Sequence, residues 1–206
     1  LLFAGCTQDF DEPIPSVPTP DGLIAINING SISQTYTTRV DDGGFCDGDQ
    51  IGLYGVNYTD NNSVAGTLLD EGNQVDNARY TFDEANWKWV SSGNIYYKDA
   101  ETHIDLYGYY PYADPTSIEA YPFEVAKDQS KAAEHGQMAT YEASDFLWAK
   151  TAKVTPTSSK VILTFRHMMS SARVRFTQGS GWTDAAEYAA ATKEVLVNST
   201  IRKSII

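Results

Sequence analysis

The sequence predicts an all-β domain, built as an antiparallel β-sandwich with one short helix at most. About eight segments have the length and composition of strands and are separated by turn-forming residues, as in antiparallel sandwiches. The 206 residues include 13 Tyr, 8 Phe and 4 Trp together with 15 Gly and 8 Pro, a composition that favours strands and turns. No repeat of fixed period and no sustained alternation of strands and helices competes with this interpretation.

The first predicted strand covers residues 23–29. Ile24, Ile26 and Ile28 fall on one face of it, while alanine and asparagine occupy the other. Strict alternation of this kind is typical of a strand with one face in the core. We therefore expect this strand to be half-buried.

The later elements are predicted from the same two signals, alternation of side chains and turn residues at the ends. In chain order, strands are expected at 50–58, 80–89, 94–98, 103–110, 146–150, 160–167, 172–177 and 194–198. The strands at 80–89 and 94–98 are expected to form a hairpin around a turn at 91–93. Residues 113–145 are polar and irregular and predict a long loop, and 184–192 predict the short helix.

Alternation also predicts which side chains fill the core. The expected core residues are Ile24, Ile26, Leu53, Leu106, Leu163, Val174 and Phe176.

The charge and the cysteine content exclude some classes of protein. The formal net charge is −12, which argues against nucleic acid as a partner because its phosphates would repel the chain. Such a charge is better explained by solubility at an exposed surface. Only two cysteines are present, so a framework of disulfides is not expected.

The beginning of the chain resembles a membrane anchor signal. Residues 3–6, Phe-Ala-Gly-Cys, resemble a bacterial lipobox with Phe3 where Leu is usual, so we expect residues 1–5 to be residual signal peptide and Cys6 to be lipidated. Residues 6–21 are acidic and rich in proline, which predicts an extended tether. Acidic residues after the cysteine also resemble the export signal of surface lipoproteins in Bacteroidetes-type bacteria. No later run reaches the roughly 18 apolar residues that span a bilayer, so the lipid is the expected anchor.

Catalytic chemistry finds little support in the motifs. The three histidines are His103, His135 and His167, and none lies in a metalloprotease motif; a nucleophile elbow and a phosphate-binding loop are also missing from the sequence. A catalytic triad is a spatial arrangement that sequence order does not reveal, so that alternative stays open. We expect no catalytic residue and no cofactor.

A cluster of aspartates raises the question of a metal site. Asp41, Asp42, Asp47 and Asp49 surround glycines, and calcium binds carboxylates in such loops, but the spacing is not that of a known calcium loop. A solvated turn without a metal is the expected structure. Cys46 lies between these aspartates, and negative neighbours raise the pKa of a thiol, so an inert cysteine is expected.

Several motifs in order along the chain resemble the fimbrillin-like (type V pilin) family. The first set is Thr38, Arg39 and Phe45 with GDQIGLY at 48–54, and the second is IDLYGYYPY at 104–112. The third is DFLWA at 145–149 followed by LTFRH at 163–167 and an apolar strand at 171–176. The resemblance runs from Cys6 to about residue 198.

This resemblance implies a transthyretin-like β-sandwich at 22–206, the N-terminal domain of a two-domain fimbrial subunit, with a C-terminal domain expected after Ile206. It implies a structural and adhesive precursor rather than an enzyme, displayed on the outer membrane and assembled into fimbriae at the cell surface. An arginine-specific or trypsin-like protease would cut between Arg39 and Val40. The first strand, which carries Leu23, Ile24, Ile26 and Ile28, would then be displaced by a donor strand.

The implied partners are other fimbrial subunits, the processing protease, the membrane through its lipid, and surface ligands on host or bacterial cells. Two alternatives remain at this point. The chain could be a glycan-binding surface lipoprotein that uses exposed Tyr and Trp side chains, or, as a third possibility, an enzyme. Arg39 could also be an ordinary exposed charge in a loop.

Overall fold

The computed structural model describes residues 22–33, 44–131, 139–169, 176–182, 184–191 and 203–205. The predicted lipidation site Cys6, the predicted cleavage site at Arg39 and Val40, and the predicted strand at 194–198 lie outside these residues.

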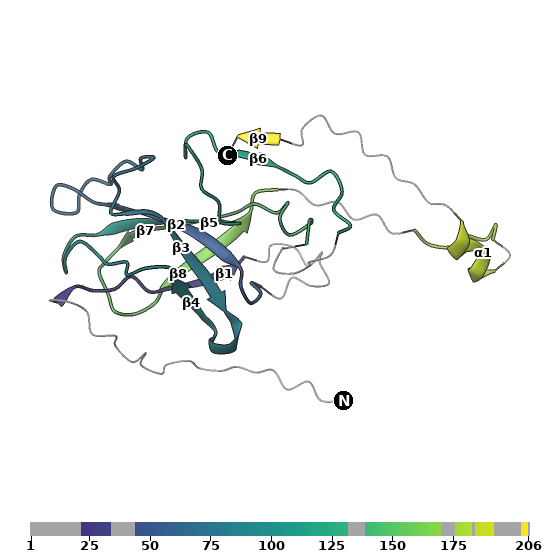
Figure 1. Cartoon of the computed structure of the whole chain (residues 1–206), viewed down its shortest axis with the longest axis horizontal. Helices are drawn as coiled ribbons and strands as arrows, with labels where there is room; N and C mark the ends of the chain where they lie inside the picture. Colours follow the sequence, from purple (N-terminus) through teal and green to yellow (C-terminus); the bar gives the residue numbers. More distant parts are fainter. Residues whose placement is uncertain are drawn as a thin grey trace.

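The described residues are mostly strands, which confirms the all-β prediction (Figure 1). The elements in chain order are β1 (Ile28–Ile32), β2 (Gln50–Asn57), β3 (Val75–Asp83), η2 (Glu84–Asn86), β4 (Lys88–Ser91), β5 (Ile104–Tyr110), β6 (Pro122–Glu124), β7 (Leu147–Val154), β8 (Val161–His167), α1 (Ala185–Ala190) and β9 (Lys203–Ile205). The short helix α1 begins as the sequence predicts, because the side chain of Asp184 accepts a hydrogen bond from Glu187 N at 2.7 Å and caps it.

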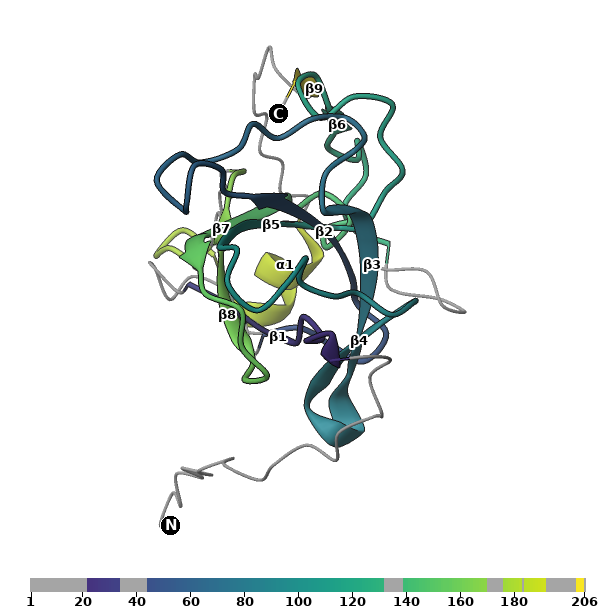
Figure 2. The same ribbon diagram turned by 90° about the vertical axis from the view of Figure 1, so that its left-hand side faces the viewer.

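Seven strands form one sheet in the order β1-β8-β7-β5-β2-β3-β4, and β6 pairs separately with β9. Neighbours in the sheet are antiparallel except β1 and β8, which are parallel. The sheet curls so that β1, at one end of this order, lies next to β4, at the other end (Figure 2). Because β7 and β8 pair at their ends, the strands make one rolled sheet, and the division into two sheets of a sandwich is not confirmed.

The predicted hairpin at 80–98 has its turn in the wrong place. The chain turns at η2, where the Asp83 side chain accepts a hydrogen bond from Asn86 N at 3.2 Å and Trp87 adopts a left-handed conformation with φ of 46°. Aromatic residues on both sides hide this turn in the sequence. The predicted strand at 94–98 is instead a short bridge at Tyr96 that pairs with Ala25.

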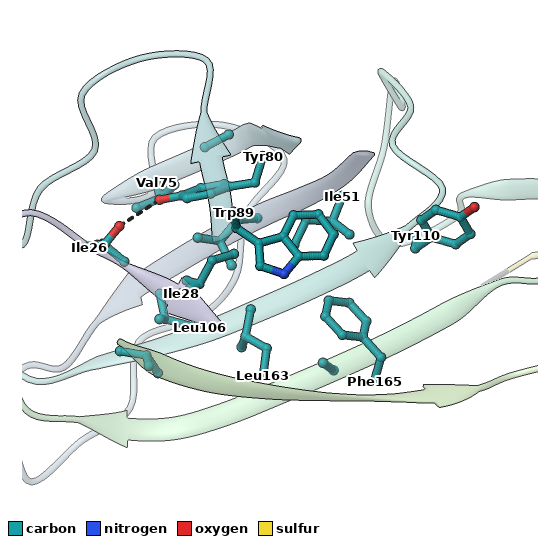
Figure 3. Packing of buried hydrophobic residues seen from close by; sticks show 14 of the residues in the cluster. Ile26, Ile28, Ile51, Val75, Tyr80, Trp89, Leu106, Tyr110, Leu163 and Phe165 are labelled. Atoms are coloured by element: carbon teal, nitrogen blue, oxygen red, sulfur yellow. Dashed lines mark hydrogen bonds between the residues drawn. The ribbon is translucent and has the colours of Figure 1, made fainter. Parts of the chain in front are cut away.

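Both faces of the central strands are buried. In β5, Ile104 and Leu106 point into the roll, and Tyr109 points to the opposite face. The inner cluster also contains Leu53 and Leu163, and Figure 3 shows it between the strands. The outer cluster consists of Tyr54, Tyr109, Phe123 and Phe146.

Part of the predicted loop at 113–145 covers the outer cluster. Its residues Ala113, Ile118, Tyr121 and Val125 pack against those aromatic rings. These apolar residues are scattered among polar ones, so neither alternation nor helical spacing marks them in the sequence. The segment is irregular, as predicted, but it contributes to the core and contains β6.

Most of the predicted core residues are buried. Ile26, Leu53, Leu106 and Leu163 are at most 3% exposed, and Ile24 is partly buried against the same cluster. The prediction for Phe176 is wrong, since its side chain is 46% exposed. The reason is that residues 176–179 form no strand, so alternation no longer directs this side chain toward the sheet. Val174 lies outside the described residues.

Replacing Leu106 by Ala should lower the free energy of unfolding by about 2–5 kcal/mol, because the deletion leaves a cavity in a well-packed core. Urea-induced unfolding followed by tryptophan fluorescence measures this loss. Phe176→Ala is the control, with an expected change of within about 0.5 kcal/mol for an exposed side chain. Equal losses for the two variants would contradict the assignment of Leu106 to the core.

Candidate functional site

The N-terminal segment, residues 24–33, is held on both of its sides by backbone hydrogen bonds. On one side it pairs with the chain that follows β4: Ile26 N donates to Ile95 O at 2.9 Å, and Tyr97 N donates to Ile24 O at 3.0 Å. These bonds flank the antiparallel bridge between residues 25 and 96. The first half of the segment therefore belongs to the β4 side of the roll.

The second half of the same segment pairs with β8. Val161 N donates to Asn27 O at 2.8 Å, the ladder of β1 follows, and Ser33 N donates to Phe165 O at 2.7 Å. The strand predicted at 23–29 is thus shifted, since the regular ladder covers residues 28–32. The cause is a change of partner near Asn27, which alternation within the segment does not indicate. We call the surface that receives the segment, made by 95–97, β4 and β8, the seat.

The apolar face of the segment fills the seat. Ile26 and Ile28 are each 3% exposed, and Ile24 and Ile32 pack against the same cluster. Leu23, at the edge, is 39% exposed. Full burial of an isoleucine side chain stabilises a fold by about 1.5–3 kcal/mol. Burial of Ile26 and Ile28 therefore contributes much of the free energy that keeps the segment in the seat.

Tyr80 of β3 adds a polar contact inside the seat. Its hydroxyl donates to Ile26 O at 2.9 Å, as the dashed line in Figure 3 marks. Burial raises the pKa of the Tyr80 phenol, so the group remains a donor. Tyr97 is equally buried, at 2% exposure, and its hydroxyl has no hydrogen-bond partner among the residues that the structure describes.

Two aromatic rings close the seat around Gly30. Trp89 of β4 and Phe165 of β8 both lie against the backbone of Gly30, and both rings are buried. Phe45 packs edge-on against each of them, with ring centroids 4.9 Å from Trp89 and 5.3 Å from Phe165. This contact between β1, β4 and β8 is what brings the two ends of the sheet order together.

The Asp145–His167 pair lies where β7 and β8 meet. His167 Nδ1 and Asp145 Oδ2 are 2.8 Å apart; Asp145 lies two residues before the start of β7, and His167 ends β8. Ser144 is bonded elsewhere, donating to Thr140 O at 2.6 Å and accepting from Ala126 N. The pair ties two strand ends together, which fits the structural role expected for His167.

Of the other two histidines, the structure describes His103. His103 Nε2 lies 3.3 Å from Thr155 Oγ1, and the ring contacts Tyr58 edge-on at 6.3 Å between centroids. His135 lies outside the described residues.

The aspartates near Cys46 serve the local turn. Asp49 accepts from Cys46 N at 2.7 Å and from the Tyr110 hydroxyl at 3.2 Å, and Asp47 accepts from Glu84 N at 3.1 Å. Burial and then the charge of Asp49 raise the pKa of the Cys46 thiol, the direction expected from the sequence. Within the described ranges, no group of three or more His, Cys, Asp or Glu side chains is placed to hold a metal ion.

One buried charge was missed by the sequence analysis. Asp105 of β5 is 2% exposed, accepts from Lys153 N at 2.7 Å and lies 3.1 Å from Lys150 Nζ. Burial alone would raise the pKa of this carboxyl, but these hydrogen bonds, another from Tyr58 and the charge of Lys150 together hold it below its usual value. The strand alternation places Asp105 away from the inner core, but it does not show that Lys150 and Lys153 of β7 contact it.

Exposed aromatic side chains are spread over different elements. Trp87 lies at the β3–β4 turn, 59% exposed, with its ring 5.5 Å from that of Phe82. Trp182 precedes α1 and packs its ring against Tyr188 at 5.4 Å. The rings of these two pairs meet edge-on, at interplanar angles of 72° and 76°, so neither pair forms the flat platform that the glycan-binding alternative requires. Among the described residues, the helices are too short to cross a bilayer.

Replacing Tyr80 by Phe should lower the free energy of unfolding by about 0.5–1.5 kcal/mol and speed hydrogen exchange at the Ile26 amide, because the Ile26 carbonyl loses its donor. Tyr97→Phe is the matched control, with an expected change near zero or slightly stabilising. Urea unfolding and amide hydrogen exchange measure both. A loss for Tyr97→Phe as large as that for Tyr80→Phe would contradict the role given to this hydrogen bond.

The sequence matches the model of a known protein family. A family model described as fimbrillin-like matches residues 38–202. A search of curated proteins found no match.

Two solved structures are similar in part. A fimbrial protein from Bacteroides ovatus is 21% identical with a TM-score of 0.41, and the alignment covers 71% of this chain and 28% of that one. A protein from Bacteroides uniformis described in terms of cell adhesion is 21% identical with a TM-score of 0.44, covering 71% of this chain and 49% of that one. The chain thus spans less than half the length of either. Because the family match takes in most of the sequence, the resemblance seen in its motifs is confirmed: the chain belongs to the fimbrillin-like family.

Proposed function

We propose that this chain is part of a fimbrial subunit precursor, a surface lipoprotein that is assembled by proteolytic loss of its first strand and donor-strand exchange. The observation that carries the proposal is the two-sided attachment of the N-terminal segment, residues 24–33, which fills a deep apolar seat. Membership of the fimbrillin-like family supports the same function.

Loss of the N-terminal segment would leave a surface suited to another strand. Backbone groups of 95–97 and of β8 would lose their partners, and the cluster around Ile26 and Ile28 would open to water. Unpaired strand edges bind extended segments readily, because main-chain hydrogen bonds give affinity and side-chain pockets give specificity. A strand from another fimbrial subunit would restore both the backbone hydrogen bonds and the burial of the apolar cluster.

The position of Arg39 suits the cut. In the sequence it lies between Ser33, whose amide donates to Phe165 O of β8, and Gly44. Cleavage after Arg39 would leave the N-terminal segment in place but held by non-covalent contacts alone. A competing strand could then displace it, with Leu23, Ile24, Ile26 and Ile28 leaving together.

An arginine-specific protease should cut a complete precursor to give a new N-terminus at Val40 and permit polymerisation. Arg39→Ala should remain a monomer under the same treatment, and Arg79→Ala, at an exposed residue of β3, should behave as the unmodified protein. N-terminal sequencing and size-exclusion chromatography measure the two steps. Normal polymerisation of Arg39→Ala would exclude this activation route.

The lipid anchor is tested separately. Cys6→Ala in a complete precursor should abolish incorporation of a labelled fatty acid and release the protein from membranes. Cys46→Ala, at an exposed position, should keep both label and membrane association. Retention of Cys6→Ala in the membrane fraction, with no label on the unmodified protein, would disprove the anchor.

A further inference from the structure

β1 carries a glycine in the middle of its inward face. Ile28, Gly30 and Ile32 alternate on that face, and Gly30 pairs in register with Leu163 of β8. Gly30 does not have a positive φ, so its backbone conformation does not require glycine. Glycine weakens a strand interior and marks places where another group approaches the backbone. The reason for a glycine here must therefore lie in its surroundings.

The surroundings leave little room for a side chain. A Cβ atom at this position would lie 3.0 Å from Trp89 Nε1 and 3.2 Å from Phe165 Cε2, inside ordinary van der Waals contact, so the rings would have to shift to admit it. One ring comes from β4 and the other from β8, so the strand is confined from both sides. The seat is thus narrow at Gly30, while it receives whole isoleucine side chains at positions 26 and 28.

Neither ring can move aside easily. Phe165 is fully buried, and a Cβ atom added to Gly108 of β5 would lie 2.9 Å from its Cζ, so the ring fits between two glycines. The ring of Trp89 contacts the rings of both Phe82 and Phe45, and the centroids of the Trp89 and Phe82 rings are 5.2 Å apart. Because cores are close-packed, displacing either ring would disturb several neighbours.

We infer that the seat selects its incoming strand by register, and that it accepts an extended segment with branched aliphatic residues at two alternate positions and glycine at the third, as in Ile26-x-Ile28-x-Gly30. This inference rests on the proposed function, since it specifies the donor strand of another subunit. A slip of two residues would place an isoleucine against Trp89 and Phe165. A slip of one residue would turn the apolar face outward. Glycine therefore fixes the single register in which a donor fits.

Displacement by synthetic peptides tests the selection. A full-length chain carrying a sequence-specific protease site in place of residues 36–41 is cut, so the experiment does not depend on Arg39. Fluorescently labelled peptides of residues 22–33 are then added, and fluorescence anisotropy follows their exchange into the cut protein. The peptides carry the natural sequence, Gly30→Val, or Ser31→Val as the matched control at an exposed position of the same strand.

The natural peptide and Ser31→Val should exchange similarly, and Gly30→Val should bind at least about tenfold more weakly, as expected for overpacking of a close-packed site. In a Trp89→Phe chain the loss for Gly30→Val should shrink, because the smaller ring widens the seat. Equal binding of Gly30→Val and the natural peptide, or an undiminished loss in Trp89→Phe, would overturn the inference while leaving strand exchange intact. If the natural peptide itself fails to exchange, the result contradicts the proposed strand exchange, and the inferred selection by register is then also wrong.

Discussion

The rolled sheet depends on one segment that includes the end strand β1 and also hydrogen-bonds to the chain that follows β4, the strand at the other end. Residues 24–26 pair with the chain after β4, and residues 27–33 pair with β8, so a single stretch of backbone bridges the two edges of the rolled sheet. Its isoleucines fill the interior that this closure creates. The segment is therefore part of the core as well as part of the sheet, and the same residues that complete the fold define the seat.

Closure at this point requires rings and glycines to fit together. Phe165 lies between Gly30 and Gly108, and Phe45 braces both Phe165 and Trp89. A glycine on each side lets an aromatic ring approach the strand backbone, which brings β1, β5 and β8 close around one packed group. Such packing is specific in shape, so a replacement strand that differs at the narrow point would not reproduce it.

Local patterns predicted several strands and the aliphatic side chains that point into the roll. Alternation placed Leu53, Leu106 and Leu163 in the core correctly, since each pairs in register with a neighbouring strand. It failed at Phe176, where no strand continues, and at the η2 turn, where a cap at Asp83 interrupts an aromatic run. Periodicity describes one element at a time and carries no information about where a strand ends its pairing.

Local sequence patterns could not predict the contacts that build the seat, because these contacts join residues far apart in the chain. Tyr80 bonds to Ile26 across 54 positions, and Trp89 meets Gly30 through the curl of the sheet. One local signal did exist: a glycine inside an otherwise apolar strand face indicates close approach by another group. The sequence alone, however, does not say which group approaches Gly30.

The place of the N-terminal segment in the chain explains how one cut could serve two purposes in the proposed function. β1 pairs with β8, more than a hundred residues later, and not with a neighbour to which a short hairpin would tether it. Cleavage between Ser33 and Gly44 therefore severs the segment's one covalent link to the rest of the domain. Cys6 lies on the same fragment, so the proposed lipid would stay with the segment that leaves. After a single cleavage, displacement of the segment by a donor strand would both fill the seat and release the subunit from the membrane, so the two events would occur together.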